Sequence, residues 1–267
     1  MTAPSNPSAE ILLATDFCEC SRSALACARQ IAQLRGAGVR ALHVLDMTTA
    51  PSSFTIARDS AERMLREVRR ELRFAGIQET ATLISGGRPA RAIREAAVRY
   101  QSSLLILGLN GARSSTLSAL GVTARALLSH APCPVVTVNR SCNGRRPASE
   151  LENSLFVTDA APESLAAALA AWPLASTACD VPLCAVFAPS SRRLPKKFAE
   201  IPEQFAPVHP FKHEDAAAAI LQQAAAKRAG LILLAFRAGS HLDSWASGSV
   251  AHGIVTAASC PVLTARC

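Results

Sequence analysis

The sequence has few aromatic side chains, no long apolar run and fewer acidic than basic residues. Phe, Trp and Tyr make up 4% of its 267 residues, although the hydrophobic fraction is 49% and the charged fraction 18%. This balance is typical of compact globular proteins and not of disordered chains, and the core must consist mainly of small aliphatic residues. Apolar runs such as 103–108 are too short to span a bilayer. The polar first ten residues lack the basic and apolar segments of a signal peptide. We therefore expect a soluble, cytoplasmic protein without membrane association.

The cysteines do not form the pattern of a disulfide-stabilised protein. There are nine, an odd number, and they are scattered through expected strands and helices. Cys18 and Cys20 have C-x-C spacing, but no His or second cysteine pair accompanies them, so no metal site is expected. These two thiols leave one distant alternative open, a thiol-based redox sensor.

The excess of basic residues does not indicate specific nucleic-acid binding. The formal net charge is +8, and basic side chains gather at 66–73 and 192–197. In the first run, Arg and Glu alternate around an apolar stripe, which is typical of the solvated face of a helix. The second run has no interleaved aromatic residues, and no recognition motif accompanies either. No specific nucleic-acid partner is therefore expected.

What the chain does contain is an internal repeat. Residues 104–138 match 231–265 at an offset of 127, which places Gly121 on Gly248. The motifs LLATD at 12–16 and LFVTD at 155–159 match at an offset of 143, so the second copy is 16 residues shorter in its middle. We call the two copies repeat one (11–138) and repeat two (155–265). A duplicated unit of this size predicts two similar domains.

Short apolar runs alternate with helical patterns in both repeats. Repeat one predicts strands at 11–15, 39–46, 80–86, 103–108 and 135–138, with helices at 21–34, 57–74 and 89–100 and a loop and helix up to 130. Repeat two predicts strands at 155–158, 183–188, 231–236 and 262–265 and helices at 162–171 and 213–228. Nearly continuous apolar strands separated by helices predict a parallel sheet covered on both faces.

The predicted fold class is therefore α/β, with two tandem Rossmann-like domains, each a five-strand parallel sheet in the order 3-2-1-4-5. The predicted boundaries are 1–140, a polar linker at 141–150, and 151–267. The basic, Pro-rich stretch 189–212 is expected to be irregular and to replace the second helix of repeat one. That is where we place the missing 16 residues.

Ligand-like residues follow the first and fourth strands of repeat one. In this strand order, ligands bind at the carboxyl ends of these strands, where the order reverses. The first strand ends in Thr15-Asp16, the fourth leads into Gly108-Leu109-Asn110-Gly111, and Gly121 follows. Glycines allow backbone amides to approach an anion, and a helix beginning near Gly121 would add its dipole. Asp16 could accept hydrogen bonds from ribose hydroxyls or help hold a metal ion. Alternatively, the glycines supply tight turns and Asp16 caps the first helix. The predicted switch point favours a nucleotide.

The glycine spacing G-x2-G-x9-G at 108–121 resembles the nucleotide-binding signature of the universal stress proteins. Other segments are similar to that family as well, namely ILLATDF at 11–17, HVLD at 43–46, GRPA at 87–90 and HAPCPVVTV at 130–138. The resemblance covers both repeats and is weaker in the second. It implies a Rossmann-like α/β fold and a role in stress tolerance, without a defined catalytic step. Some members of the family bind ATP and some do not.

The resemblance also implies roles for individual residues. Thr15, Asp16 and the backbone at Val44 would form the adenine and ribose side. The phosphate side would consist of Gly108, Asn110, Gly111, Gly121 and Thr123. Val122 stands where the family usually has Ser or Thr, so one phosphate-facing hydroxyl is missing. A lost hydrogen bond to a charged group costs about 1.5–3 kcal/mol, roughly a tenfold to hundredfold weakening.

Repeat two keeps a degenerate version of the same site. Asp159 and Gly248-Ser249 remain, but Ala235 and Ala238 stand where the first two glycines were. A methyl group blocks close approach to the backbone. We therefore expect repeat two to be mainly structural.

The sequence thus predicts a tandem universal-stress-type protein that binds an adenine nucleotide, ATP with Mg2+, in repeat one. Any ATP hydrolysis would be slow, because no general base or arginine finger is evident, and no catalytic or metal-ligating residue is assigned. The alternative is a nucleotide-free interaction module that acts through a protein partner. The resemblance further implies an intramolecular pseudo-dimer in which the last strands, 135–138 and 262–265, meet. Whether whole chains form a further homodimer stays open. His43, in an apolar strand, is interpreted as a satisfied core residue.

Overall fold

The computed structural model describes residues 10–45, 51–111, 120–140, 142, 153–159, 161–174, 183–187, 208–212, 216–239 and 249–267. The chain divides into two compact units, Met1–Arg140 and Ser141–Cys267. Repeat one lies in unit 1 and repeat two in unit 2. Of the predicted linker 141–150, only Cys142 belongs to the described residues.

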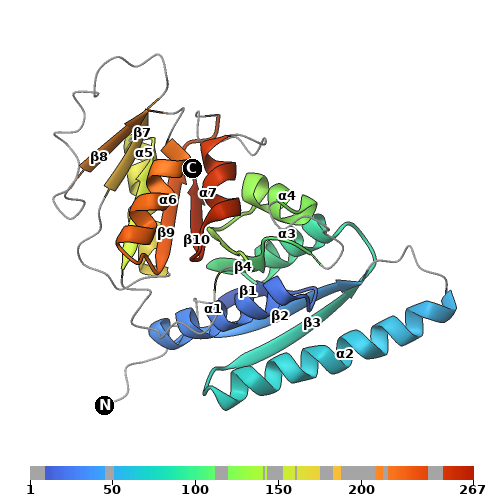
Figure 1. The fold of residues 1–267 in the computed structure, drawn as a ribbon. Helices are drawn as coiled ribbons and strands as arrows, with labels where there is room; N and C mark the ends of the chain where they lie inside the picture. Colours follow the sequence, from blue (N-terminus) through green and yellow to red (C-terminus); the bar gives the residue numbers. More distant parts are fainter. Residues whose placement is uncertain are drawn as a thin grey trace. The chain divides into compact units, whose positions relative to one another are not determined.

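Unit 1 is a parallel sheet whose strands alternate with helices along the chain (Figure 1). Its elements are β1 (Glu10–Ala14), α1 (Glu19–Arg35), β2 (Gly38–Leu45), α2 (Pro51–Phe74), β3 (Glu79–Ser85), α3 (Pro89–Arg99), β4 (Leu104–Gly108), α4 (Val122–His130) and β5 (Val135–Val138). The strand order is β3-β2-β1-β4-β5, and every pairing is parallel. The predicted fold class and order are confirmed for this unit.

The connections of unit 1 place helices on both faces of its sheet. The chain steps from β1 to β2 to β3 in one direction and returns through β4 to β5 in the other. Because such crossovers are right-handed, α1 and α2 cover one face and α3 and α4 the other. Arg29 on α1 accordingly forms an ion pair with Glu71 on α2, at 3.3 Å.

The central strands of unit 1 are buried on both sides. Leu12 and Leu13 of β1, and Leu105 and Ile106 of β4, have no exposed side-chain surface. This explains why these strands read as continuous apolar runs and not as an alternating pattern. Helix α1 ends at Gly36, whose φ of 61° is the left-handed conformation that commonly terminates helices. The longest helix, α2, begins at Pro51, six residues before the predicted start.

Unit 2 repeats the same arrangement with one helix fewer among the described residues. Its elements are β6 (Ser154–Thr158), α5 (Pro162–Ala171), the 3-10 turn η2 (Trp172–Leu174), β7 (Leu183–Phe187), β8 (Val208–Lys212), α6 (Ala216–Ala226), β9 (Leu231–Phe236), α7 (Val250–Ala257) and β10 (Val262–Arg266). The order β8-β7-β6-β9-β10, again parallel, corresponds to 3-2-1-4-5. This confirms the predicted order for unit 2.

One local prediction in repeat two is wrong. The end of the stretch expected to be irregular is β8, which pairs in parallel with β7. Pro210 lies within this strand, and its missing N–H argued against a strand. The residue is tolerated because β8 is the last strand on that side, where an outward-facing donor is not needed.

The shortening of repeat two falls where it was predicted, between its second and third strands. Residues 46–78 join β2 to β3 and include α2, whereas only 188–207 join β7 to β8. The latter segment lies outside the described residues. Within the part of the chain that is described, no helix is both long and apolar enough to cross a bilayer.

Candidate functional site

The predicted site residues of repeat one lie at the carboxyl edge of the unit 1 sheet. Thr15 and Asp16 follow β1, Val44 lies near the end of β2, and Gly108 ends β4. Strands β1 and β4 are neighbours, and the helices that follow them cover opposite faces of the sheet. The position between them is therefore the switch point at which open α/β sheets bind ligands.

Asp16 is exposed, and its carboxylate is held in a fixed orientation. Oδ1 accepts the Ser21 hydroxyl at 2.6 Å and the Cys18 backbone N–H at 3.1 Å. A Cβ placed on Gly111 would lie 2.9 Å from Asp16 Oδ2. The loop after β4 therefore lies close to this carboxylate, and the missing side chain of Gly111 leaves room for it. Asp16 and Gly111, which come from distant parts of the sequence, lie side by side at this edge of the sheet.

The other two glycines of the motif are required by the packing of the chain. A Cβ on Gly108 would lie 2.8 Å from Cys20 Cβ, so this glycine allows α1 to approach β4. A Cβ on Gly121 would lie 2.9 Å from the Leu109 carbonyl oxygen. Close packing therefore explains why residues 108 and 121 are glycines. Gly111, in contrast, leaves space beside Asp16.

The first turn of α4 presents backbone amides at the same edge. The helix begins at Val122 with Gly121 as its N-cap, and among the described residues no side-chain capping hydrogen bond is found there. The Val122 side chain is 87% exposed, and Thr123 is half-buried. An uncapped helix N-terminus attracts anions through its amides and its dipole. This end of α4 can therefore accept a negatively charged group.

Two aromatic rings beside Asp16 were not assigned to the site from the sequence. Phe17 adopts a left-handed backbone conformation with φ 63°, which is uncommon for a residue other than glycine. Its N–H donates to Thr15 Oγ1 at 3.0 Å, and its ring centroid lies 4.5 Å from that of His43. His43 Nδ1 lies 2.7 Å from the Thr15 carbonyl oxygen, which can only accept, so this nitrogen carries the proton. His43 is satisfied, as interpreted, but it also borders the site.

The thiols near the site do not have the properties of a redox sensor. Cys20 is buried, and Cys18 Sγ lies 3.2 Å from the Asn110 carbonyl oxygen, linking α1 to the loop after β4. Burial, followed by the neighbouring Asp16 carboxylate, raises the pKa of Cys18 above its usual value. A reactive thiol needs the opposite shift. The structure therefore argues against the redox alternative.

In repeat two the equivalent carboxylate has different partners. Asp159 Oδ1 accepts the Ala161 N–H at 3.2 Å, while Oδ2 lies 3.4 Å from the Arg237 backbone N–H and 3.7 Å from its Nε. Helix α7 is capped by its own Ser249, whose hydroxyl oxygen accepts the His252 N–H at 3.3 Å. Gly248, assigned to the degenerate second site, lies outside the described residues.

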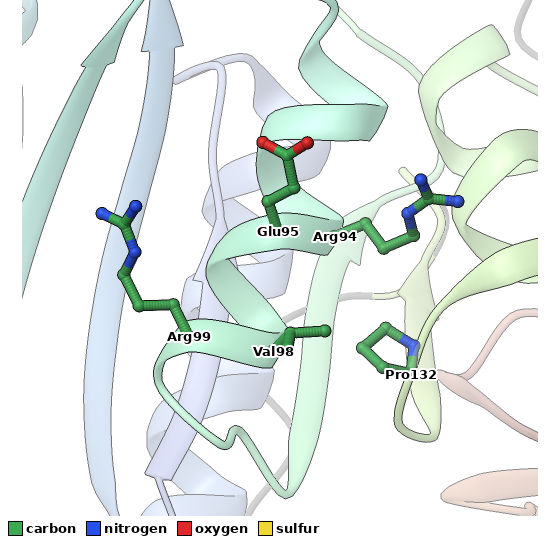
Figure 2. Close-up of a pocket in the computed structure, with 5 residues that line it drawn as sticks. All are labelled: Arg94, Glu95, Val98, Arg99 and Pro132. Carbon is green, nitrogen blue, oxygen red and sulfur yellow. The ribbon is translucent and has the colours of Figure 1, made fainter.

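A hollow of about 310 Å³ lies at the opposite end of the unit 1 sheet. It is formed by the last turns of α3 and by Pro132, which precedes β5. Figure 2 shows Val98 directed toward Pro132, Arg94 on the same side of the helix, and Arg99 on the other side. Glu95 forms an ion pair with Arg91 at 2.7 Å. Among the residues that the structure describes, no three His, Cys, Asp or Glu side chains gather to hold a metal ion.

The fold and the site together define a tandem Rossmann-like α/β protein with a carboxylate and an uncapped helix N-terminus at one switch point. Comparison with known proteins identifies the group to which it belongs. The family model described as "Universal stress protein family" matches residues 9–139 and 155–266. The chain belongs to the universal stress protein family, in tandem form.

The chain is similar to individual proteins and solved structures. A universal stress protein of Thermus aquaticus, encoded in the QAH/OAS sulfhydrylase 3′ region, is 30% identical over 132 residues, which cover 48% of this chain and 96% of that protein. The crystal structure of a universal stress protein from Archaeoglobus fulgidus DSM 4304 covers 97% of this chain, and 96% of that chain is covered, with a TM-score of 0.77 at 19% identity. Another Archaeoglobus fulgidus universal stress protein, solved in complex with dAMP, covers 50% of this chain and is itself covered to 99%, with a TM-score of 0.41 at 21% identity.

Proposed function

We propose that repeat one binds an adenine nucleotide, ATP with Mg2+, and that the protein acts in the stress response through this bound state. The observation that carries the proposal is the meeting of Asp16 and Gly111 at the switch point, beside the uncapped start of α4. A carboxylate and a cluster of backbone amides accept the two chemically different ends of a nucleotide. The carboxylate accepts ribose hydroxyls, and the amides bind phosphate oxygens.

The neighbouring residues fit the remaining part of such a ligand. Val44 and the ring pair of Phe17 and His43 lie at the β1–β2 side of Asp16, where the base would be placed. Thr15, Gly108, Asn110, Gly121 and Thr123 complete the predicted set. Mg2+ would neutralise the triphosphate charge when bound. Phosphate oxygens and water molecules would fill its octahedral coordination sphere.

Val122 is the feature that weakens this site. It is exposed at the start of α4 and offers no hydroxyl to a phosphate. The amides of the same turn remain as donors, so we expect binding to be weakened and not lost. No general base is aimed at the phosphate side by any contact described above. Any ATP hydrolysis would accordingly be slow.

Calorimetric titration of MgATP into nucleotide-stripped protein tests the proposal. Gly111→Ala should weaken binding, because its methyl group would lie 2.9 Å from Asp16 Oδ2 and displace this carboxylate. Gly38→Ala is the matched control, since its Cβ would meet Gln78 O at an ordinary 3.5 Å, at the other end of β2. Equal binding by wild type and both variants would refute the site. Absence of binding by wild-type protein would refute the function.

The hollow on α3 supports a second candidate function, docking of an acidic segment of a partner protein. Val98 is 61% exposed there and faces Pro132, with the Arg94 guanidinium beside it (Figure 2). An apolar surface flanked by a cation is complementary to an acidic segment that carries an apolar side chain. A purified partner retained by wild type and by Arg125→Glu, but lost with Val98→Asp, would support it. Retention by Val98→Asp would refute it.

Three further expectations stay predictions. They are the pairing of the repeats through 135–138 and 262–265, a further homodimer of whole chains, and the cytoplasmic location. Small-angle scattering of the wild type and of a variant with charges in both strands would test the pairing. Equal compactness of the two would contradict it.

A further inference from the structure

Asp16 and Asp159 occupy equivalent positions, and each accepts the backbone N–H of the residue two positions further on, just before the next helix. At the offset of 143, the Cys18 N–H that Asp16 accepts corresponds to the Ala161 N–H that Asp159 accepts. The surroundings of the two carboxylates differ otherwise. Asp16 is exposed, whereas the Asp159 side chain retains only 2% of its exposure. The Asp159 carboxylate is therefore shielded from solvent, unlike that of Asp16.

Arg237 is the residue in contact with it. At the offset of 127 it replaces Asn110, directly after β9. Its backbone N–H and its Nε lie 3.4 Å and 3.7 Å from Asp159 Oδ2, while its side chain stays about half exposed. A carboxylate this buried is stable only with a compensating charge or hydrogen bonds. The chain itself supplies a cation at the position where a ligand would meet Asp159.

Ser164 lacks the contact with the aspartate that its counterpart in repeat one makes. It is equivalent to Ser21, whose hydroxyl donates to Asp16 at 2.6 Å. The Ser164 hydroxyl is completely buried and has no hydrogen-bond partner among the described residues. A buried hydroxyl without a partner is costly. Asp159, whose counterpart in repeat one accepts the equivalent hydroxyl, contacts Arg237 instead.

We propose that Arg237 is an internal cation that closes the switch point of repeat two against nucleotides. By contacting the Asp159 carboxylate, Arg237 takes up the acceptor that ribose hydroxyls would need. Arg237 therefore determines which repeat can bind a nucleotide. Ala238 assists, because it carries a methyl group where Gly111 leaves space. The inference rests on the proposed function of the switch point in repeat one.

The test restores the Asn-Gly pair of repeat one in repeat two. Ala238→Gly alone is the matched control, and Arg237→Asn with Ala238→Gly is the test variant. Carboxylates are modified with carbodiimide and glycine ethyl ester in the full-length protein and read by peptide mass spectrometry, with Asp16 as internal reference. MgATP sites are counted by calorimetry. In the test variant, modification of Asp159 should rise at least tenfold to the level of Asp16, and one nucleotide site should be gained. The control should change neither.

The outcomes separate the two proposals. A rise from one site to two supports both. A rise from zero to one supports the closing role of Arg237 and refutes binding by repeat one. Persistent protection of Asp159 in the test variant would overturn the inference, and so would an exposed Asp159 without a gained site. Unchanged modification of Asp16 and an unchanged circular-dichroism spectrum show that the variant is folded.

Discussion

The two repeats share a strand order and an aspartate at the same position, but they differ in what the aspartate contacts. Asp16 is exposed, accepts Ser21 and lies beside Gly111. Asp159 is covered and contacts Arg237. The strand order that positions both carboxylates is the same in each unit, so the difference lies in the side chains that follow the fourth strand. The fold and the site are therefore separable.

The helices that follow the fourth strands, α4 and α7, differ in how their N-termini are capped. In α7, the Ser249 hydroxyl caps its own helix. Helix α4 has Val122 at the equivalent position and no side-chain cap. The missing hydroxyl was expected only to weaken phosphate binding. The N-cap of α4 is Gly121, which has no side chain that could cap the amides of the first turn. These amides are the donors that we propose for a phosphate.

The largest expected effect is the loss of stability when a buried leucine is shortened in either unit, which tests whether the two cores are equivalent. Leu12 and Leu155 are equivalent at the offset of 143, and neither has exposed surface. Leu12→Ala and Leu155→Ala should each lower the free energy of unfolding by about 2–5 kcal/mol, because each leaves a cavity. Urea denaturation measures this, with the partly exposed Leu169→Ala as control. A cost below about 1 kcal/mol at one position would show unequal packing.

The thiols before the last strands provide the next comparison. Burial raises the pKa of Cys133 from 9.0 to about 11. Because only the thiolate reacts, iodoacetamide should modify Cys133 about a hundredfold more slowly near pH 8 than an unshifted thiol, and the rate should rise until about pH 11. Cys260, at 2% exposure, should react more slowly still, and the exposed Cys267 fastest. Equal rates for Cys133 and Cys267 would contradict this order.

A third prediction concerns how closely the first helix approaches the fourth strand. Gly108→Ala should destabilise unit 1 by about 1–3 kcal/mol, because its Cβ would lie 2.8 Å from Cys20 Cβ. Repeat two already accommodates the buried Ala235 at the equivalent position. Thermal unfolding of Gly108→Ala and of the control Gly38→Ala measures the difference. If both variants melt like wild type, α1 does not need the glycine.

The smallest expected effect makes the α4 terminus resemble that of α7. Val122→Ser should tighten MgATP binding by about tenfold through one added hydrogen bond to a charged group. Val122→Ala removes the same exposed side chain without adding a hydroxyl and should leave the affinity unchanged. Weaker binding by the Ser variant would mean that its hydroxyl caps the helix and competes with the ligand, as Ser249 does in α7.

The sequence predicted the strands and their order well because repetition and buried parallel strands leave strong patterns. It failed at β8, where Pro210 argued against a strand that its edge position permits. For the site, it identified Asp16 and Gly111 correctly as neighbours at one sheet edge. It could not distinguish Gly111 from Gly108 and Gly121, since that requires knowing which atoms a Cβ would meet.

Two contacts were missed for a related reason. Phe17 lies in the loop after β1 and His43 lies on β2, and only the folded sheet places their rings 4.5 Å apart. No sequence motif indicates a role for Arg237, whereas Ala235 and Ala238 depart visibly from the glycine motif of repeat one. A residue-by-residue alignment of the two repeats after the fourth strand would have placed Arg237 on Asn110. The meaning of the substitution still depends on the contact with Asp159.

The most direct test of the account is the stoichiometry of MgATP binding in nucleotide-stripped protein, compared between Asp16→Ala and Asp159→Ala. Because Asp16 is exposed, whereas the Asp159 side chain is buried and contacts Arg237, we expect one site per chain that is lost in Asp16→Ala and unchanged in Asp159→Ala. Two sites in the wild type, or one site that survives Asp16→Ala and disappears in Asp159→Ala, would contradict the assignment of an open repeat one and a closed repeat two.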